Sequence, residues 1–362
     1  MTSNARELAQ IPSTPSGRRN LIINGAMTVW QRGTSDDTAS NNDYACDRWQ
    51  IGFTGLEGNV DWDRSTDTPD DFSYSLKVSM DASETSLDAG DRIHIQQKFE
   101  GQDIQHLRYG SSGAKTCTVS FWVKSSVAAT YTLDIFQNED VTNRVIGRSY
   151  TINAADTWEH KTITFVGDTA QAIENDNSEG LRLGWWLDAG STFTSGPFSE
   201  DWQDYDATER IHSTTGWLES TSPEFYITGV QLEVGTVATE FEHRSFGEEL
   251  QLCQRYFQYY ENPPIRGVVA GSTQGYRMAM VLPVVMRANP SLTLQQTGST
   301  SHFRVYDGSV TATYSSFNAS YLKQAKIELD VITTGSSLTQ GRAACLYDSI
   351  SYESAFLIDA EL

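Results

Sequence analysis

The residues that could do chemistry are spread along the chain without the spacing that common catalytic motifs require. The sequence contains no G-x-G-x-x-G, P-loop, H-E-x-x-H or G-x-S-x-G motif, so four common enzyme classes lack their local signature. No histidine lies two or four positions from another, and the four cysteines form no C-x-x-C pair. The sequence therefore predicts neither a zinc centre nor a thiol redox site.

One acidic stretch offers oxygen ligands of the kind that calcium prefers, and it contains Asp61, Asp63, Asp67, Asp70 and Asp71. It departs from an EF-hand loop, because Thr66 stands where the turn glycine would be and Phe72 where the bidentate acid would be. We interpret the stretch as a solvated loop and predict no cofactor. A structural calcium ion remains open as an alternative.

Carboxylates are abundant, with 47 Asp and Glu residues against 26 Lys and Arg, and the formal net charge is −21. Such a charge repels phosphate backbones and anionic membrane surfaces, so we predict no nucleic-acid partner and no membrane insertion. A glycoside hydrolase needs two carboxylates about 5 to 9.5 Å apart, but no motif marks such a pair. We therefore predict a protein that is not an enzyme, and keep a polysaccharide depolymerase as an alternative.

Aromatic residues give the clearest sign of binding. The segment from residue 185 to residue 217 contains Trp185, Trp186, Trp202, Tyr205 and Trp217. Flat rings among Asp, Asn and Ser suit sugars, because the apolar face of a pyranose stacks on a ring while carboxylates accept hydrogen bonds from its hydroxyls. We expect Trp185 and Trp217 in a core. Trp202 and Tyr205, in the polar loop SEDWQDYDA, are the predicted glycan contacts.

Short alternating runs from residue 20 to residue 244 predict strands. In CTVSFWVK, Val119, Phe121 and Val123 share one face, while Trp122 lies on the other face with polar residues. Helical periodicity is nearly absent, so the chain is predicted to be all-β, with a jelly-roll sandwich over 20–244. Further alternating runs predict a smaller C-terminal β-sandwich, a tip domain, over 263–362.

The two β regions are joined by a predicted helix over 245–262, which opens with the capping box Ser245-x-x-Glu248. An a/d rhythm of apolar residues follows, and this candidate trimer seam consists of Phe246, Leu250, Cys253, Phe257 and Tyr260. One interpretation is a linking helix that lies on a domain. The other is that three copies of the helix meet on a symmetry axis.

The first 19 residues read as an extended N-terminal arm, because IPSTPSG contains two prolines that restrict the backbone. Such an arm cannot bury a core by itself, so we expect it to dock on another protein. No apolar run is long enough for a transmembrane helix or a secretory signal. We therefore expect synthesis in a cytoplasm.

Three stretches carry a resemblance to a known family: GRRNLIINGAMTVWQRGT with YACDRWQ, then KTCTVSFWVKSS, then EFYITGVQLEVGTVATEFEHRSFGEELQLCQRYFQYY. Together they resemble the tail-fibre and related virion structural proteins of tailed bacteriophages, which carry a jelly roll similar to carbohydrate-binding modules. The resemblance implies that LIING and YITGVQLEVG come together to complete the sandwich. It also implies a homotrimer on the virion.

The resulting prediction is a tail-fibre-type virion structural protein that is made in the bacterial host cytoplasm. Its N-terminal arm would attach to other tail or head proteins, and its domains would bind a host surface polysaccharide through several weak contacts. A head-decoration or tail-adaptor protein without receptor binding is the first alternative. The depolymerase is the second.

Overall fold

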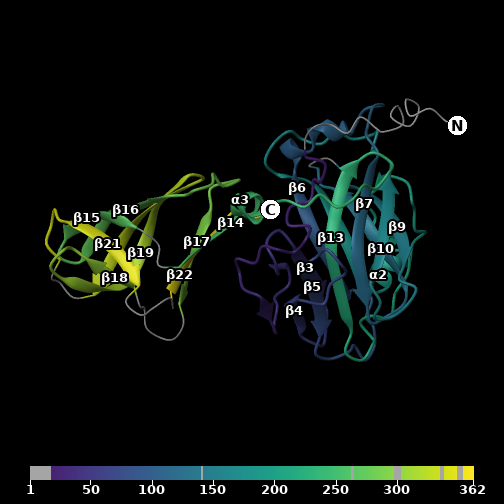
Figure 1. Cartoon of the computed structure of the whole chain (residues 1–362), viewed down its shortest axis with the longest axis horizontal. Coiled ribbons are helices and arrows are strands. Elements are labelled where there is room, and N and C mark those ends of the chain that lie inside the picture. The colour runs from purple at the N-terminus through teal and green to yellow at the C-terminus, as the bar shows by residue number, and fades with distance from the viewer. Residues whose placement is uncertain (1–17, 140–141, 262–264, 297–302, 335–337, 349–353) are drawn as a thin grey trace. The chain divides into compact units, whose positions relative to one another are not determined.

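The computed structural model describes residues 18–139, 142–261, 265–296, 303–334, 338–348 and 354–362. The chain divides into two compact units, unit 1 (Met1–Phe246) and unit 2 (Gly247–Leu362), and Figure 1 labels many of their strands. The predicted arm over 1–19 lies outside the described residues except for its last two positions. Among the described helices, none has the length and hydropathy needed to span a membrane.

Unit 1 is a sandwich of two antiparallel sheets, which confirms the predicted all-β jelly roll. The six-stranded sheet has the order β1 (Ser35–Asp36), β4 (Val60–Ser65), β5 (Ser75–Met80), β13 (Glu224–Val234), β7 (Cys117–Ser125), β10 (Glu159–Phe165). The seven-stranded sheet has the order β12 (Gln203–Asp204), β9 (Arg144–Thr151), β8 (Thr130–Gln137), β11 (Glu179–Ala189), β6 (Arg92–Glu100), β3 (Gln50–Thr54), β2 (Asp43–Tyr44). Short helical turns lie in the connections: η1 (Gly101–Asp103), η2 (Gln105–Leu107), α2 (Ser191–Thr194), η3 (Ala207–Glu209).

The alternation along each strand separates the core from the outer faces. Val119, Phe121 and Val123 of β7 are buried between the sheets, whereas Trp122 points away from them. Trp185 and Trp217 are fully buried in the same core, as predicted. Each sheet therefore presents a second, outward face on which polar and aromatic side chains gather.

The opening LIING segment lies against β13, as the resemblance implied. Leu21 N donates to Leu232 O at 2.9 Å, and Val230 N donates to Gly25 O at 2.9 Å. Gly25 is required there, because a Cβ at this position would lie 2.1 Å from Val230 O. The first described residues thus extend the six-stranded sheet next to its closing strand.

Asn24 fixes the turn that follows this segment. Its side chain is buried and its backbone is left-handed, with φ of 57°. Its Oδ1 accepts hydrogen bonds from Thr28 N (2.8 Å) and Val29 N (3.0 Å), while Nδ2 donates to Val29 O (2.9 Å) and Asp47 O (3.0 Å). One amide side chain therefore satisfies four buried backbone groups from two segments.

Unit 2 is also mostly β, but it contains a closed barrel where the sequence predicted a small sandwich. The barrel has the order β15 (Arg266–Gly271), β16 (Gln274–Val281), β20 (Lys326–Thr334), β19 (Thr311–Lys323), β18 (Phe303–Tyr306), β21 (Ala343–Asp348). A separate three-stranded sheet has the order β14 (Phe257–Glu261), β22 (Ser354–Asp359), β17 (Ser291–Gln296). The alternating residues Ile327, Leu329 and Val331 are buried, and inward alternation of this kind serves a barrel and a sandwich equally well.

The predicted helix over 245–262 is wrong in its second half. The helix α3 covers Phe246–Gln254, and Tyr256 N donates to Cys253 O in the turn that follows it. Phe257 and Tyr260 lie in β14, which pairs with β22 and packs against the core of unit 2. Pairing with β22 satisfies the backbone of this aromatic-rich stretch, and it overrides a heptad rhythm only about two repeats long. The five seam residues therefore do not share one helical face.

Candidate functional site

A groove with a volume of about 1140 Å³ opens on the outer face of the six-stranded sheet of unit 1. Trp122 of β7, His160 of β10 and Gly229 of β13 contribute to its floor. Its walls are two connecting segments, 68–72 between β4 and β5, and 238–243 after β13. Segments far apart in the sequence thus enclose one surface site.

Five aromatic or imidazole rings line this groove. Trp122 and His160 have ring centroids 5.1 Å apart. Phe72, Phe241 and His243 form a second group, with centroids 5.1 Å apart for Phe72–Phe241, 5.5 Å for Phe72–His243 and 4.8 Å for Phe241–His243. Trp122, Phe72 and Phe241 are half-buried and the histidines are exposed, so ring surface remains open to solvent.

Gly229 allows the two ring groups to approach each other. It lies in an irregular stretch of β13 with φ of +61°, a conformation that a side chain makes costly. A Cβ at this position would lie 2.6 Å from Phe72 Cζ and 3.0 Å from Trp122 Cδ1. The floor of the groove thus depends on a residue without a side chain.

We expect Gly229→Ala to destabilise unit 1 by roughly 1–2 kcal/mol, because the left-handed backbone is strained for alanine and the two rings must move. Urea unfolding, followed by tryptophan fluorescence, measures the change. Gly216→Ala is the matched control, since Gly216 also has a positive φ but a Cβ there would meet no atom within 4 Å. Equal losses in the two variants would contradict a role for ring contact.

The wall that carries Phe72 is braced by Asp67. Lys124 Nζ and Trp158 Nε1 donate to its carboxylate, the latter at 2.8 Å. The hydrogen bond from Lys124, followed by that from Trp158, lowers the pKa of Asp67. Thr68 Oγ1 donates to Phe72 O at 2.8 Å, and this bond closes the loop. The Phe72 ring is therefore presented by a loop fixed at both ends.

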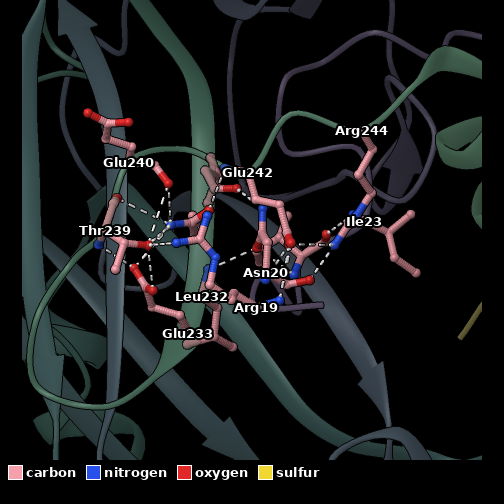
Figure 2. A network of polar contacts seen from close by, with 12 residues as sticks. Arg19, Asn20, Ile23, Leu232, Glu233, Thr239, Glu240, Glu242 and Arg244 are labelled. Atoms are coloured by element: carbon pink, nitrogen blue, oxygen red, sulfur yellow. Dashed lines mark hydrogen bonds and ion pairs between the residues drawn. The ribbon is translucent and has the colours of Figure 1, made fainter. Parts of the chain in front are cut away.

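The wall that carries Phe241 is held by two side chains of β13 (Figure 2). Glu233 accepts hydrogen bonds from Thr239 N (2.7 Å) and Thr239 Oγ1 (2.8 Å), and Gln231 Oε1 accepts one from Glu242 N (2.8 Å). Glu242 in turn accepts hydrogen bonds from Arg19 N (3.1 Å) and Asn20 N (2.8 Å). Phe241 therefore extends from a backbone fixed on both sides.

Arg244 completes this network by binding the first described segment of the chain. Its guanidinium donates to Ile22 O at 2.8 Å and to Asn20 O, and Arg19 Nη1 donates to Thr239 Oγ1 at 2.9 Å. Figure 2 shows Arg19 in the middle of the network, with Thr239 on one side and Arg244 on the other. The first and last segments of unit 1 are thus joined directly beside the groove.

The polar groups of the groove suit hydroxyl ligands. Asp70, Asp71 and Glu240 line it and are exposed. Their carboxylates can accept hydrogen bonds from hydroxyls, while the rings offer apolar faces. Partial desolvation by the surrounding groove lowers the pKa of His160, which favours the neutral imidazole with one donor and one acceptor. This combination is chemically suited to flat, hydroxyl-bearing molecules.

The sequence-predicted contacts Trp202 and Tyr205 do not line the groove. Trp202 is half-buried against the unit 1 core, and its Nε1 donates to Val166 O at 2.7 Å. Tyr205 is 38% exposed, and its ring meets the edge of Phe136 with centroids 5.4 Å apart. Their role as glycan contacts stays a prediction, and Tyr205 offers the more open ring.

Sequence reasoning missed the rings that form the groove. A signal existed for Trp122, because it alternates with Phe121 and Val123 onto the polar face of a strand. No local signal existed for Phe72 or Phe241, whose meeting depends on two loops that are far apart in the sequence. The acidic stretch is now divided between strand and loop, with Asp70 and Asp71 at the groove. Among the described residues, no group of three or more His, Cys, Asp or Glu is arranged to hold a metal ion.

Asp61 of β4 lies close to several other carboxylates, which repel its charged form. Burial, followed by the charges of the nearby Asp81, Asp37, Asp63 and Asp36, raises its pKa to about 6. A raised pKa stabilises the fold below pH 4, and this stabilisation is lost as the pH rises through about 6.

We therefore expect Asp61→Asn to raise the melting temperature at pH 7.5 and to reduce the loss of stability between pH 4 and pH 6. Thermal unfolding across this pH range measures both effects. Asp63→Asn on the same strand is the control, and an equal gain from it would show that net charge alone is responsible. A variant that melts at or below the native chain at pH 7.5 would disprove the prediction.

Comparisons with known proteins found similarity to solved structures at low sequence identity. No protein-family model matches it, and no curated protein matches it. A family 4 carbohydrate-binding module is similar, with 17% identity and a TM-score of 0.33 over 59% of this chain and 98% of that one. The enzymatically active domain of tailspike protein 4 of bacteriophage CBA120 has 13% identity and a TM-score of 0.31 over 55% of this chain and 21% of that one. A family 11 carbohydrate-binding module of a Clostridium thermocellum cellulase has 11% identity and a TM-score of 0.29 over 57% and 95%.

Proposed function

We propose that unit 1 binds a saccharide chain in the groove on its six-stranded sheet. The carrying observation is the group of partly open rings, Trp122 with His160 and Phe72 with Phe241, beside exposed carboxylates. Sugar rings stack on aromatic faces through their C–H groups, while carboxylates bind the hydroxyls that point outward. A groove of this volume, open at its surface, accommodates an internal stretch of a polysaccharide.

Affinity electrophoresis of the purified chain through gels that contain neutral bacterial polysaccharides tests this proposal. Retardation that is relieved by soluble oligosaccharide is the expected result. Migration unaffected by every polysaccharide, together with no signal on a glycan array, would overturn saccharide binding in the groove.

We propose binding without catalysis. Glycoside hydrolysis uses a carboxylic acid of raised pKa beside a second carboxylate. The carboxyl groups of Asp61 and Glu139, whose pKa values rise to about 6 and about 7, do not line the groove. A reducing-end assay on each bound polysaccharide distinguishes the two functions. Release that disappears in Glu240→Gln would establish a depolymerase instead.

We propose further that the protein acts as a trimeric virion fibre with host-surface adhesion, attached through its N-terminal residues. The resemblance of the LIING and YITGVQLEVG segments to tail-fibre proteins supports this role, and three weak saccharide sites on one particle would act together. Antibody labelling of intact virions distinguishes an exposed fibre from an internal head or tail adaptor.

Light scattering coupled to gel filtration tests the trimer. We expect a mass three times the 40.3 kDa of one chain at micromolar concentration. A mass of one chain would refute the trimer and leave saccharide binding by unit 1 intact. Phe246, which is 60% exposed, is the first residue to substitute, because a trimer that buries it should dissociate in Phe246→Ser.

A further inference from the structure

The outer face of the seven-stranded sheet of unit 1 carries a cationic cluster. Arg92 and His94 extend from β6, Arg182 extends from β11, and Arg210 follows η3. Burial and the nearby Arg210, Arg182 and Arg92 lower the pKa of His94 well below its usual value. A concentration of positive charge is unusual in a chain with a formal net charge of −21.

Aromatic rings hold these guanidinium groups in place. The Arg182 and Arg210 guanidiniums lie 4.5 and 4.8 Å from the centroid of Phe136. Arg210 also lies 4.9 Å from Trp186 and 5.4 Å from the exposed Tyr205. Stacking of this kind fixes the direction in which the planar N–H groups point.

The charge of the cluster is only partly compensated. Arg210 Nε pairs with Asp134 at 2.6 Å, and Arg182 Nε pairs with Glu179 at 3.0 Å. Arg92 lies over Phe193 at 5.2 Å but forms no hydrogen bond or ion pair with the described residues, and its Nε is buried. Burial, with Arg210 and Arg182, lowers its pKa, which is the direction that crowding of like charges produces.

Buried polar atoms without partners surround the same place. Among the described residues, His94 Nδ1, Trp186 Nε1 and Asp134 Oδ1 have no hydrogen-bond partner. His94 is 8% exposed, Trp186 is 2% exposed and Asp134 is fully buried. His94 and Trp186 stack with centroids 4.7 Å apart. Buried polar atoms in folded proteins are nearly always satisfied, so His94 Nδ1 beside the arginines is available to a polar ligand at this face.

We propose that this cluster is a second binding site, in which the Arg92 guanidinium binds the carboxylate of an acidic saccharide and Tyr205 contacts the sugar ring. A guanidinium matches a carboxylate or a sulfate with two parallel hydrogen bonds. An anion would balance the charge of Arg92, which forms no ion pair with any residue that the structure describes. The groove on the six-stranded sheet should exclude acidic saccharides, because Asp70, Asp71 and Glu240 line it and would repel an anion.

Calorimetric titration of the full chain with sodium glucuronate, sodium sulfate and glucose tests the site, at an ionic strength held constant with sodium chloride. Saturable binding of glucuronate with none of glucose is the expected result. Binding of sulfate alone would overturn the saccharide assignment, because the ring contact would contribute nothing. A lack of saturable binding by either anion would overturn the site.

Arg92→Gln separates binding from folding. We expect it to weaken glucuronate binding at least about tenfold, since a charge-assisted pair is lost. In the absence of an anion it should melt no lower than the native chain, because Arg92 makes no ion pair and repels two neighbours. If Arg92 had only a structural role, Arg92→Gln would lower the melting temperature and leave the affinity for glucuronate unchanged. That result would overturn the proposal.

Two controls show that the two sites are independent. Arg64→Gln removes another arginine of unit 1 that stacks on a ring, Tyr74 at 4.6 Å, and it should bind glucuronate like the native chain. Trp122→Ala alters the groove and should also bind glucuronate normally. Loss of glucuronate binding in Trp122→Ala would place the anion in the groove and overturn the second site.

Discussion

Trp122→Ala is expected to weaken neutral polysaccharide binding by roughly thirtyfold, about 2 kcal/mol, while unit 1 stays folded. Trp122 carries the largest ring in the groove. Its ring centroid lies 5.1 Å from that of His160, and it borders the Cβ position at Gly229 together with the Phe72 ring. Its side chain points away from the core, so its removal deletes a stacking surface without opening an interior cavity. Affinity electrophoresis gives the dissociation constant, and circular dichroism checks the fold.

Tyr205→Ala is the matched variant for this experiment. It removes the exposed ring that the sequence predicted as a glycan contact, and that ring lies outside the groove. We expect it to bind neutral polysaccharide like the native chain. A greater loss from Tyr205→Ala than from Trp122→Ala would move the neutral-saccharide site to the seven-stranded sheet and disprove the groove.

The largest expected effect on stability comes from Asn24→Ala, at roughly 4 kcal/mol. The substitution removes four hydrogen bonds to the backbone of Thr28, Val29 and Asp47, each typically contributing about 1 kcal/mol, and among the described residues only Val29 O keeps another, from Asp47 N at 3.3 Å. Alanine also tolerates the left-handed backbone less well than asparagine does. Urea unfolding of the native chain and the variant measures the loss.

Asn42→Ala measures how much of the loss comes from placing alanine in a left-handed backbone. Asn42 is exposed and has φ of 68°, so its substitution keeps the conformational cost and removes no comparable buried network. Asn24→Asp keeps the acceptor and removes the donor, and it should fall between the native chain and Asn24→Ala. A loss in Asn24→Ala no greater than that in Asn42→Ala would show that the network contributes little.

The sandwich could be predicted because its evidence is local. Val119, Phe121 and Val123 alternate with outward residues, and this period of two marks a strand wherever the strand lies. The groove could not be predicted in this way. Phe72 and Phe241 are separated by well over a hundred residues, and only the paths of the two loops bring their rings to 5.1 Å.

The linker shows how local evidence can mislead. The spacing from Phe246 to Tyr260 fits a helix, but Phe257 and Tyr260 are equally suited to a strand. Whether this stretch forms a helix or a strand depends on β22, whose residues Ala355 to Asp359 pair with it from about a hundred positions away. Barrel closure in unit 2 also depends on distant pairing, because the alternation along β20 fits a barrel and a sandwich equally well.

The network around Glu242 and Arg244 has a consequence for engineering. It brings residues 19–23 and 239–244 together, so the sandwich can be cut out with two neighbouring ends. Domains whose ends lie close together tolerate transplantation into surface loops of other proteins. Residues 18–246 should therefore serve as a portable cassette, which a host protein could carry without distortion provided that the Arg244 clamp is retained.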